Sequence, residues 1–147
     1  MLARLGYRTS VTVVPDGLAV YLEAVQDSRN RAQIGSYGWV ADYPAPSSFI
    51  TTMLSCGAFR PSTPRQTNVA EFCDSSIDAT IDRARRLQAT DPTAANALWG
   101  EIDRRLTDQA PFVVTSTAKD LGFVSKRVGN YQYNPQWGVL LSRLWVR

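Results

Sequence analysis

The stretch that decides the fold runs from residue 33 to residue 46 and reads QIGSYGWVADYPAP. Apolar and polar residues alternate through its first half, which predicts a strand over about residues 32–40. The strand leads into Asp42 between Trp39 and Tyr43, and two prolines then end it. Such an acid can present a partly desolvated negative charge at the rim of a cleft, where a ligand's ammonium group would pair with it. Alternatively, Asp42 opens a turn by hydrogen bonding to its own backbone.

Length and composition indicate one globular domain. The chain has 147 residues, and its 44% hydrophobic content is enough for a core. The 16 basic and 13 acidic residues are scattered, and the net charge of +3 gives no support to nucleic-acid binding. No stretch approaches the ~18 apolar residues of a membrane span. Residues 1–6 lack the continuous apolar run of a signal peptide, so we expect none in this chain.

The residue types present argue against catalysis. The chain has no histidine, which excludes a Ser-His or Cys-His nucleophile pair and histidine metal ligands. Its two cysteines cannot build a four-thiolate zinc site, and no glycine-rich phosphate loop is present. A pair of carboxylates remains open, with Asp42 and either Asp74 or Glu71. We expect a protein that is not an enzyme, with no catalytic residue, no cofactor and no metal site.

The two cysteines bear on the cellular compartment. Cys56 and Cys73 bracket a loop rich in Pro, Ser, Thr and Asn. A bridge across a loop of this size would add roughly 3 kcal/mol in the chain-entropy model. Disulfides persist outside the cytosol, whereas two free thiols are the usual state in an intracellular protein. The residues alone leave both states open.

The remaining pattern alternates strands with helices, which indicates an α/β fold. Strand-like runs lie at residues 10–14, 112–114 and 121–124. Caps and apolar periodicity predict helices after Asp16, from Pro46, after Asp74 or Ser75, and from Asp91-Pro92 to before Pro111. Trp99 and Trp145 are predicted core residues. In the polar stretch 130–138, the aromatic residues belong either to a packed flap or to a ligand rim; they are Tyr131, Tyr133 and Trp137.

Several of these features occur in an order that points to one family. In chain order they are Trp39-Val40-Ala41-Asp42-Tyr43-Pro44, Cys56, Asn68, Cys73-Asp74, Arg85-Arg86-Leu87, Leu98-Trp99, Pro111-Phe112, Gly129-Asn130-Tyr131 and Leu144-Trp145. This order resembles the carboxyl-terminal part of the family-5 solute-binding proteins of bacterial ABC importers, which bind peptides, dipeptides and nickel. The resemblance covers about residues 5–147. Its most specific parts are the Trp-x-x-Asp-Tyr-Pro segment and the paired cysteines.

The resemblance implies a partial lobe of a periplasmic-binding-protein-like type II fold, with a mixed sheet and flanking helices. Residues 1–118 would be the C-terminal part of the second, ligand-binding lobe, and residues 119–147 a tail that returns to the first lobe. Family members are several times longer. We therefore expect a fragment with exposed strand edges and weak solute affinity of its own.

The resemblance also implies a function. Family members bind a solute between two lobes and deliver it to a membrane permease. In the peptide binders, the aspartate that corresponds to Asp42 pairs with the peptide's α-ammonium, and Trp39 matches the strand tryptophan, with Tyr43 beside them. Related binders carry a cysteine pair here, which favours a Cys56–Cys73 disulfide. Ala45 stands where many relatives carry an acid, which leaves the charge of the ligand open.

The solute would then be a peptide or a similar small cationic or zwitterionic molecule, and the partner an ABC permease. The location would be extracytoplasmic, in the periplasm or at the cell surface, as for a lipoprotein-derived chain. Two other classes remain. One is a disulfide-stabilised protein-interaction module without a role in small-molecule transport. The other is a small hydrolase, which would need a second carboxylate within about 10 Å of Asp42.

Overall fold

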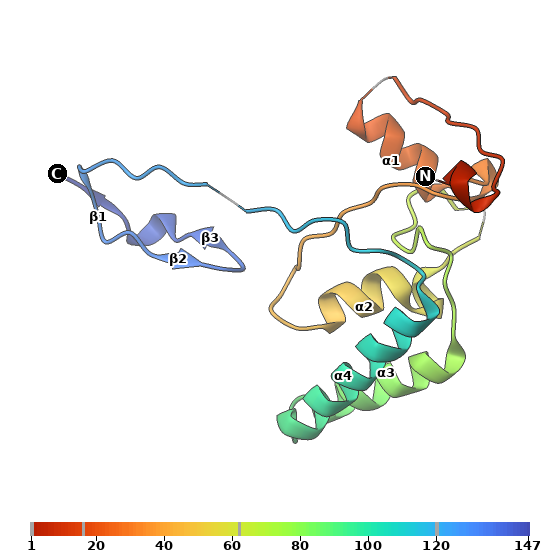
Figure 1. Ribbon diagram of the computed structural model, residues 1–147. Helices are drawn as coiled ribbons and strands as arrows, with labels where there is room; N and C mark the ends of the chain where they lie inside the picture. Colours follow the sequence, from red (N-terminus) through yellow and green to blue (C-terminus); the bar gives the residue numbers. More distant parts are fainter. Residues whose placement is uncertain (1, 16, 62, 120) are drawn as a thin grey trace.

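The computed structural model describes residues 2–15, 17–61, 63–119 and 121–147. Figure 1 shows a helical body formed by α2 (Ser47–Leu54), α3 (Ser75–Leu87) and α4 (Pro92–Gln109). Helix α1 (Leu18–Gln26) lies to one side of this body. A long arm leads from the end of α4 to a small β unit at the C-terminus. The chain is therefore a mixed α/β structure whose helical and strand parts are spatially separate.

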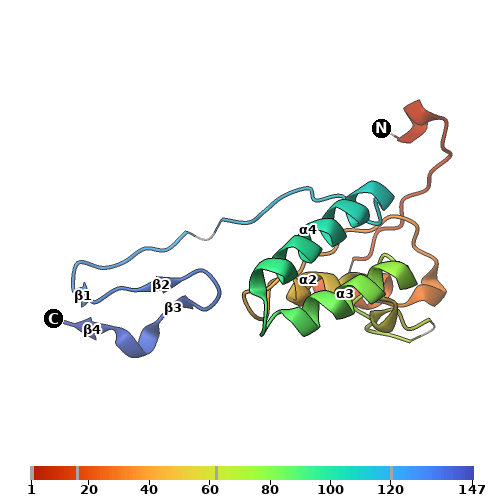
Figure 2. The same ribbon diagram turned by 90° about the horizontal axis from the view of Figure 1, so that it is seen from below.

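The core lies among the three helices of the body. Helices α3 and α4 form an antiparallel pair, and α2 packs across them (Figure 2). The buried apolar side chains of the core cluster belong to all three helices; they are Ile50, Leu54, Ile77, Ile81, Ala84, Trp99, Ile102 and Leu106. Trp99 is 3% exposed, as predicted. Apolar residues spaced three and four positions apart thus face one shared core, as the sequence periodicity predicts.

Helix ends form where the cap residues predict them. Asp74 accepts hydrogen bonds from the backbone N–H groups of Ser76 and Ile77 at the start of α3. Asp91 accepts one from Ala94, and Pro92 occupies the first turn of α4. These side chains satisfy backbone donors that have no partner within the helix. The predicted cap of α1, Asp16, lies outside the described residues.

Within the described residues, four short 3-10 turns and four short strands accompany these helices. The turns are Leu2–Leu5, Ser28–Asn30, Cys56–Ala58 and Leu141–Arg143. The strands are β1 (Val128–Gly129), β2 (Tyr133–Asn134), β3 (Gly138–Val139) and β4 (Trp145–Val146). β1 pairs with β4 and β2 with β3, both antiparallel, as two separate two-stranded sheets.

The prediction that Trp145 is a core residue is wrong. Trp145 lies on β4 opposite Gly129 and is 48% exposed. Its ring occupies the space above Gly129, where an added Cβ atom would collide with the ring. The Arg147 guanidinium lies 5.3 Å from the ring centroid. The small β unit has no core into which this indole could pack, so the ring covers a glycine on the surface instead.

The predicted strands at residues 10–14, 32–40, 112–114 and 121–124 do not pair in the described chain. Their large apolar side chains are mostly exposed, with Val11 at 87% and Phe123 at 96%. A strand is stabilised by its neighbours, and none of these segments has one here. The predicted mixed sheet is therefore replaced, within the described residues, by extended unpaired segments.

Candidate functional site

The three predicted ligand-binding residues lie in the segment that leads from the Ser28–Asn30 turn to α2. The backbone N–H of Asp42 donates a hydrogen bond of 2.7 Å to the Ser48 hydroxyl. Ser48 is fully buried in the first turn of α2. Beyond it, the Ala45 N–H donates to the Tyr43 carbonyl at 2.8 Å. The helix start thus fixes the backbone that carries Asp42.

The Asp42 carboxylate itself is free within the part of the chain that the structure describes. Asp42 is exposed, and neither an ion pair nor a hydrogen bond involves its side chain there. The turn in which Asp42 would bond to its own backbone is therefore not formed. An anchored but unpaired carboxylate remains available to a cation from outside the chain.

Trp39 precedes Asp42 on a half-buried face of the same segment. Its ring stacks on Tyr37 with centroids 6.5 Å apart. The Tyr37 hydroxyl accepts a hydrogen bond of 3.2 Å from Gln26 on α1. The Trp39 indole N–H is covered and has no hydrogen-bond partner among the described residues. Leaving such a donor unsatisfied costs about 1–3 kcal/mol, so an acceptor that reached it would be favoured.

A fourth residue, Gln136, joins this segment from the C-terminal β unit. Its side-chain amide donates to the carbonyl of Ala41, the residue before Asp42. The backbone N–H groups of Gln136 and Trp137 donate to the Asn134 side chain, which holds the turn between β2 and β3. The sequence marks Gln136 only through its position after Asn134-Pro135, a pair of residues that favours a turn. This hydrogen bond places the turn between β2 and β3 beside Ala41, the residue that precedes Asp42.

The predicted disulfide between Cys56 and Cys73 is confirmed. The disulfide closes a loop, and the buried Asn68 side chain lies across this loop. The Asn68 amide donates hydrogen bonds to the carbonyls of Ser55 and Phe72 and accepts one from the Phe72 N–H. The Cys56 N–H donates to the Asp78 carboxylate at 3.1 Å. Burial is the main cause that raises the pKa of Asp78, and this hydrogen bond opposes it. The loop is therefore held to the body at several points.

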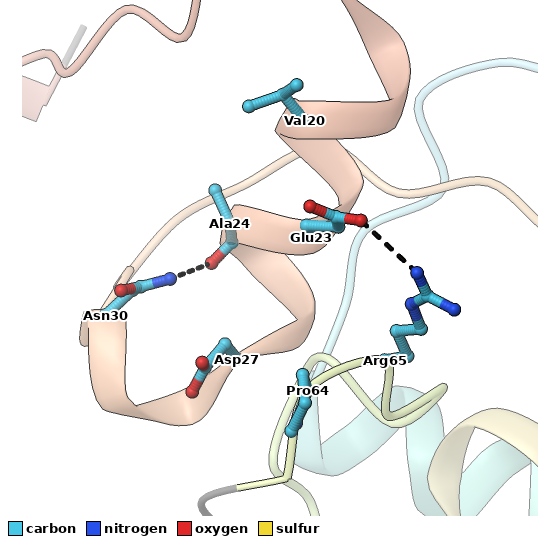
Figure 3. Close-up of a pocket in the computed structure, with 7 residues that line it drawn as sticks. All are labelled: Val20, Glu23, Ala24, Asp27, Asn30, Pro64 and Arg65. Atoms are coloured by element: carbon cyan, nitrogen blue, oxygen red, sulfur yellow. Dashed lines mark hydrogen bonds and ion pairs between the residues drawn. The ribbon is translucent and has the colours of Figure 1, made fainter.

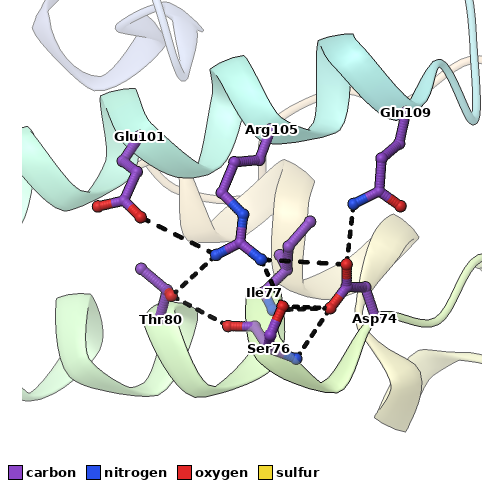
Figure 4. Close-up of polar contacts among 7 residues, drawn as sticks. All are labelled: Asp74, Ser76, Ile77, Thr80, Glu101, Arg105 and Gln109. Atoms are coloured by element: carbon purple, nitrogen blue, oxygen red, sulfur yellow. Dashed lines mark hydrogen bonds and ion pairs between the residues drawn. The ribbon is translucent and has the colours of Figure 1, made fainter.

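Asp74, one of the acids considered as a catalytic partner of Asp42, has a structural role. Figure 4 shows it among polar side chains at the start of α3. The Ser76 hydroxyl, then the Gln109 amide and the backbone of α3, hold the pKa of Asp74 well below its usual range. Arg105 lies 4.0 Å from it and 3.9 Å from Glu101, which precedes Arg105 by four residues on α4. An acid with a lowered pKa is poorly suited to donate a proton near neutral pH.

Two open hollows lie elsewhere on the surface. One, of about 670 Å³, lies between α1 and the Pro64–Arg65 segment, where Arg65 pairs with Glu23 at 3.5 Å (Figure 3). The other, of about 380 Å³, lies beside the disulfide and includes Asp78 and Asp82. Neither includes Trp39, Asp42 or Tyr43. Asp42 therefore lies outside both of these hollows.

The described residues contain no group of three side chains suited to hold a metal ion. Within the same residues, no helix has the length and apolar character needed to cross a membrane. No family model, no curated protein and no solved structure matches the chain. The assignment of function therefore depends on the residues and their geometry.

Proposed function

We propose that this chain is a fragment of the extracytoplasmic solute-binding component of an ABC importer, and that it binds peptides or similar small cationic or zwitterionic solutes. The observation that carries the proposal is the Asp42 carboxylate, which is unpaired on a backbone anchored by Ser48. In this proposal, residues 1–118 form part of a type II binding lobe and residues 119–147 the tail that returns to the other lobe. The solute would be delivered to a membrane permease.

Asp42 would fix the α-ammonium, a charged group that all unblocked peptides share. An exposed ion pair contributes only about 0–1 kcal/mol, because water screens both charges. The Trp39 and Tyr43 rings, which are neighbours of Asp42 in the sequence, would add cation–π attraction of about 0.5–2 kcal/mol, increasing as water is excluded. An affinity in the millimolar range is therefore expected for this chain alone. Tight binding would require a second wall that removes water from Asp42.

The extracytoplasmic location is part of the same proposal. The Cys56–Cys73 disulfide supports it, because such bonds persist in oxidising compartments. A chain that folds in the cytosol would carry two reduced thiols. Mass analysis of the protein from its native source, without reducing agent, should find the two cysteine peptides linked.

The binding proposal is tested by calorimetric titration with trialanine and with its N-acetyl form. The wild-type chain should bind trialanine saturably, and acetylation should weaken binding about tenfold or more, because it removes the charged amine. Asp42→Asn should weaken the binding of trialanine and narrow the difference between the two peptides. Asp103→Asn is the matched control, since Asp103 is also exposed and its loss changes the net charge equally. Equal binding of trialanine by wild type and Asp42→Asn would refute the role of Asp42.

A second candidate, a protein-interaction module, is favoured by the exposed apolar side chains of the unpaired segments. Val11, Val40, Val113 and Leu121 are each more than two-thirds exposed. Such surfaces mark protein contacts when they form continuous patches. A well-folded chain that gives no heat with any peptide, and whose self-association or partner binding is insensitive to Asp42→Asn, would favour this function over transport.

A further inference from the structure

The chain exposes far more surface than a compact protein of its size. Its accessible surface is 11429 Å² for a mass of 16.3 kDa. A compact monomer of this mass exposes about 7,500 Å². The excess of about 3,900 Å² is larger than the roughly 1,200–2,000 Å² that a stable protein–protein interface buries in total. The chain therefore has exposed surface left over that contact with a second copy could cover.

One exposed segment, residues 32–41, has the properties of a strand whose edge is free to pair. Residues 32–41 contain neither a charged residue nor a proline, the two features that usually protect an edge from pairing. From residue 36 to residue 41, exposed and half-buried side chains alternate. Tyr37 and Trp39 stack on the half-buried side, whereas Ile34 and Val40 are 75% and 83% exposed. This alternation is the side-chain pattern of an extended strand.

One edge of this segment is used at Ser36, whereas the other edge is free from Gly35 to Trp39 and accepts a hydrogen bond from Gln136 only beyond them, at the Ala41 carbonyl. The backbone N–H and carbonyl of Ser36 both bond to the Tyr21 hydroxyl of α1. In a strand, the backbone groups of alternate residues point to opposite edges. Those of Gly35, Tyr37 and Trp39 therefore point away from Tyr21, and none of them has a hydrogen bond within the described residues. These odd-numbered residues present a free row of donors and acceptors.

The sequence on either side of Tyr37 is self-complementary. At equal distances from Tyr37 lie Ser36 and Gly38, then Gly35 and Trp39, then Ile34 and Val40. An antiparallel pair of the same segment from two copies obeys a two-fold axis. Centred on Tyr37, it would oppose Ile34 with Val40 of the second copy, and Gly35 with the bulky Trp39. A shift of one residue would move these apolar side chains to opposite faces.

We propose that two copies of this chain associate by antiparallel pairing of residues 35–39, in the register that centres on Tyr37. The odd-numbered residues supply the backbone hydrogen bonds between the copies. Ile34 of each copy packs against Val40 of the other at closely spaced positions that share no backbone bond. The inference goes beyond the proposed function, because Asp42 lies outside the paired residues.

The register of the strand pair is tested by measuring the dimer dissociation constants of two double variants and of wild type by sedimentation. Ile34→Lys/Val40→Lys places like charges opposite each other twice, whereas Ile34→Lys/Val40→Glu places opposite charges there. Both positions are exposed in the single chain, so both variants should keep the wild-type helical signal. Like charges directly opposite each other destabilise a strand pair. The lysine pair should raise the dimer dissociation constant about tenfold or more relative to the Lys/Glu variant.

The expected result is a wild-type dimer that the Lys/Lys variant loses and the Lys/Glu variant retains. A wild-type chain that stays monomeric from about 1 μM to about 1 mM would overturn the proposal. So would two variants with the same dissociation constant, which would place the contact in another register or on another surface. A chain that pairs only with an added, different protein would also overturn it and would point to a heterologous partner.

Discussion

Replacing both cysteines of the disulfide by serine tests how the loop at residues 56–73 is stabilised. The bond joins cysteines that are 17 positions apart. In the chain-entropy model, closing a loop of this length stabilises the folded state by about 3 kcal/mol at 25 °C. Cys73 is exposed and Cys56 only half-buried, so serine loses little apolar burial. The predicted loss therefore comes mainly from the greater freedom of the unfolded chain.

Urea denaturation of Cys56→Ser/Cys73→Ser, followed by far-UV circular dichroism of the helices, measures this loss. With a slope of about 1–3 kcal/mol per molar urea, the midpoint should fall by about 1–3 M. Reduced wild-type protein is the control and should match the double variant. A loss below about 1 kcal/mol would contradict the reasoning. It would mean that the hydrogen bonds of Asn68 and Asp78 already hold the loop when the covalent bond is absent.

The other predictions concern the helical body. Trp99→Ala should lower the free energy of unfolding by about 3–5 kcal/mol, because the ring is 3% exposed in the core. A loss near zero in urea denaturation would show that the ring is not packed. Asp74 has a lowered folded-state pKa, so its stabilisation is present above about pH 4 and is lost as the pH falls through the folded-state pKa. Asp74→Ala should therefore flatten the acid limb of a stability profile, and an unchanged limb would count against this. Asp78 has a raised pKa, so its favourable contribution is present below about pH 4 and is lost as the pH rises through the folded-state pKa. Asp78→Asn, which keeps an acceptor for Cys56, should be at least as stable as wild type at neutral pH; a clear loss in thermal denaturation would refute this.

The helices could be predicted from the sequence because their signals are local. The Asp91-Pro92 start of α4 and the Asp74 cap of α3 each act within one turn of helix. Strands depend on distant partners, and residues 10–14 alternate as a strand should but meet no neighbour in the described chain. Trp145 looks like a core residue by type, and nothing in the sequence shows that it lies over Gly129.

In the candidate site, too, the local contact could be predicted from the sequence and the long-range contact could not. The link from Asp42 to Ser48 spans six residues and follows from the turn before α2. The link from Gln136 to Ala41 spans 95 residues, a separation over which local patterns carry no information. The unpaired state of the Asp42 carboxylate is likewise a property of the folded chain, since any distant arginine or lysine could have neutralised it.

The most direct test of the central claim is a ¹⁵N-resolved NMR titration of the chain with trialanine, repeated with N-acetyl-trialanine. The account predicts saturable shifts at the backbone amides around Asp42 and at the Trp39 indole N–H, with little response to the acetylated peptide. Asp42→Asn should weaken the response, and Asp103→Asn should keep it. Shifts confined to other surfaces, or the same shifts with both peptides, would contradict recognition of an ammonium group by Asp42.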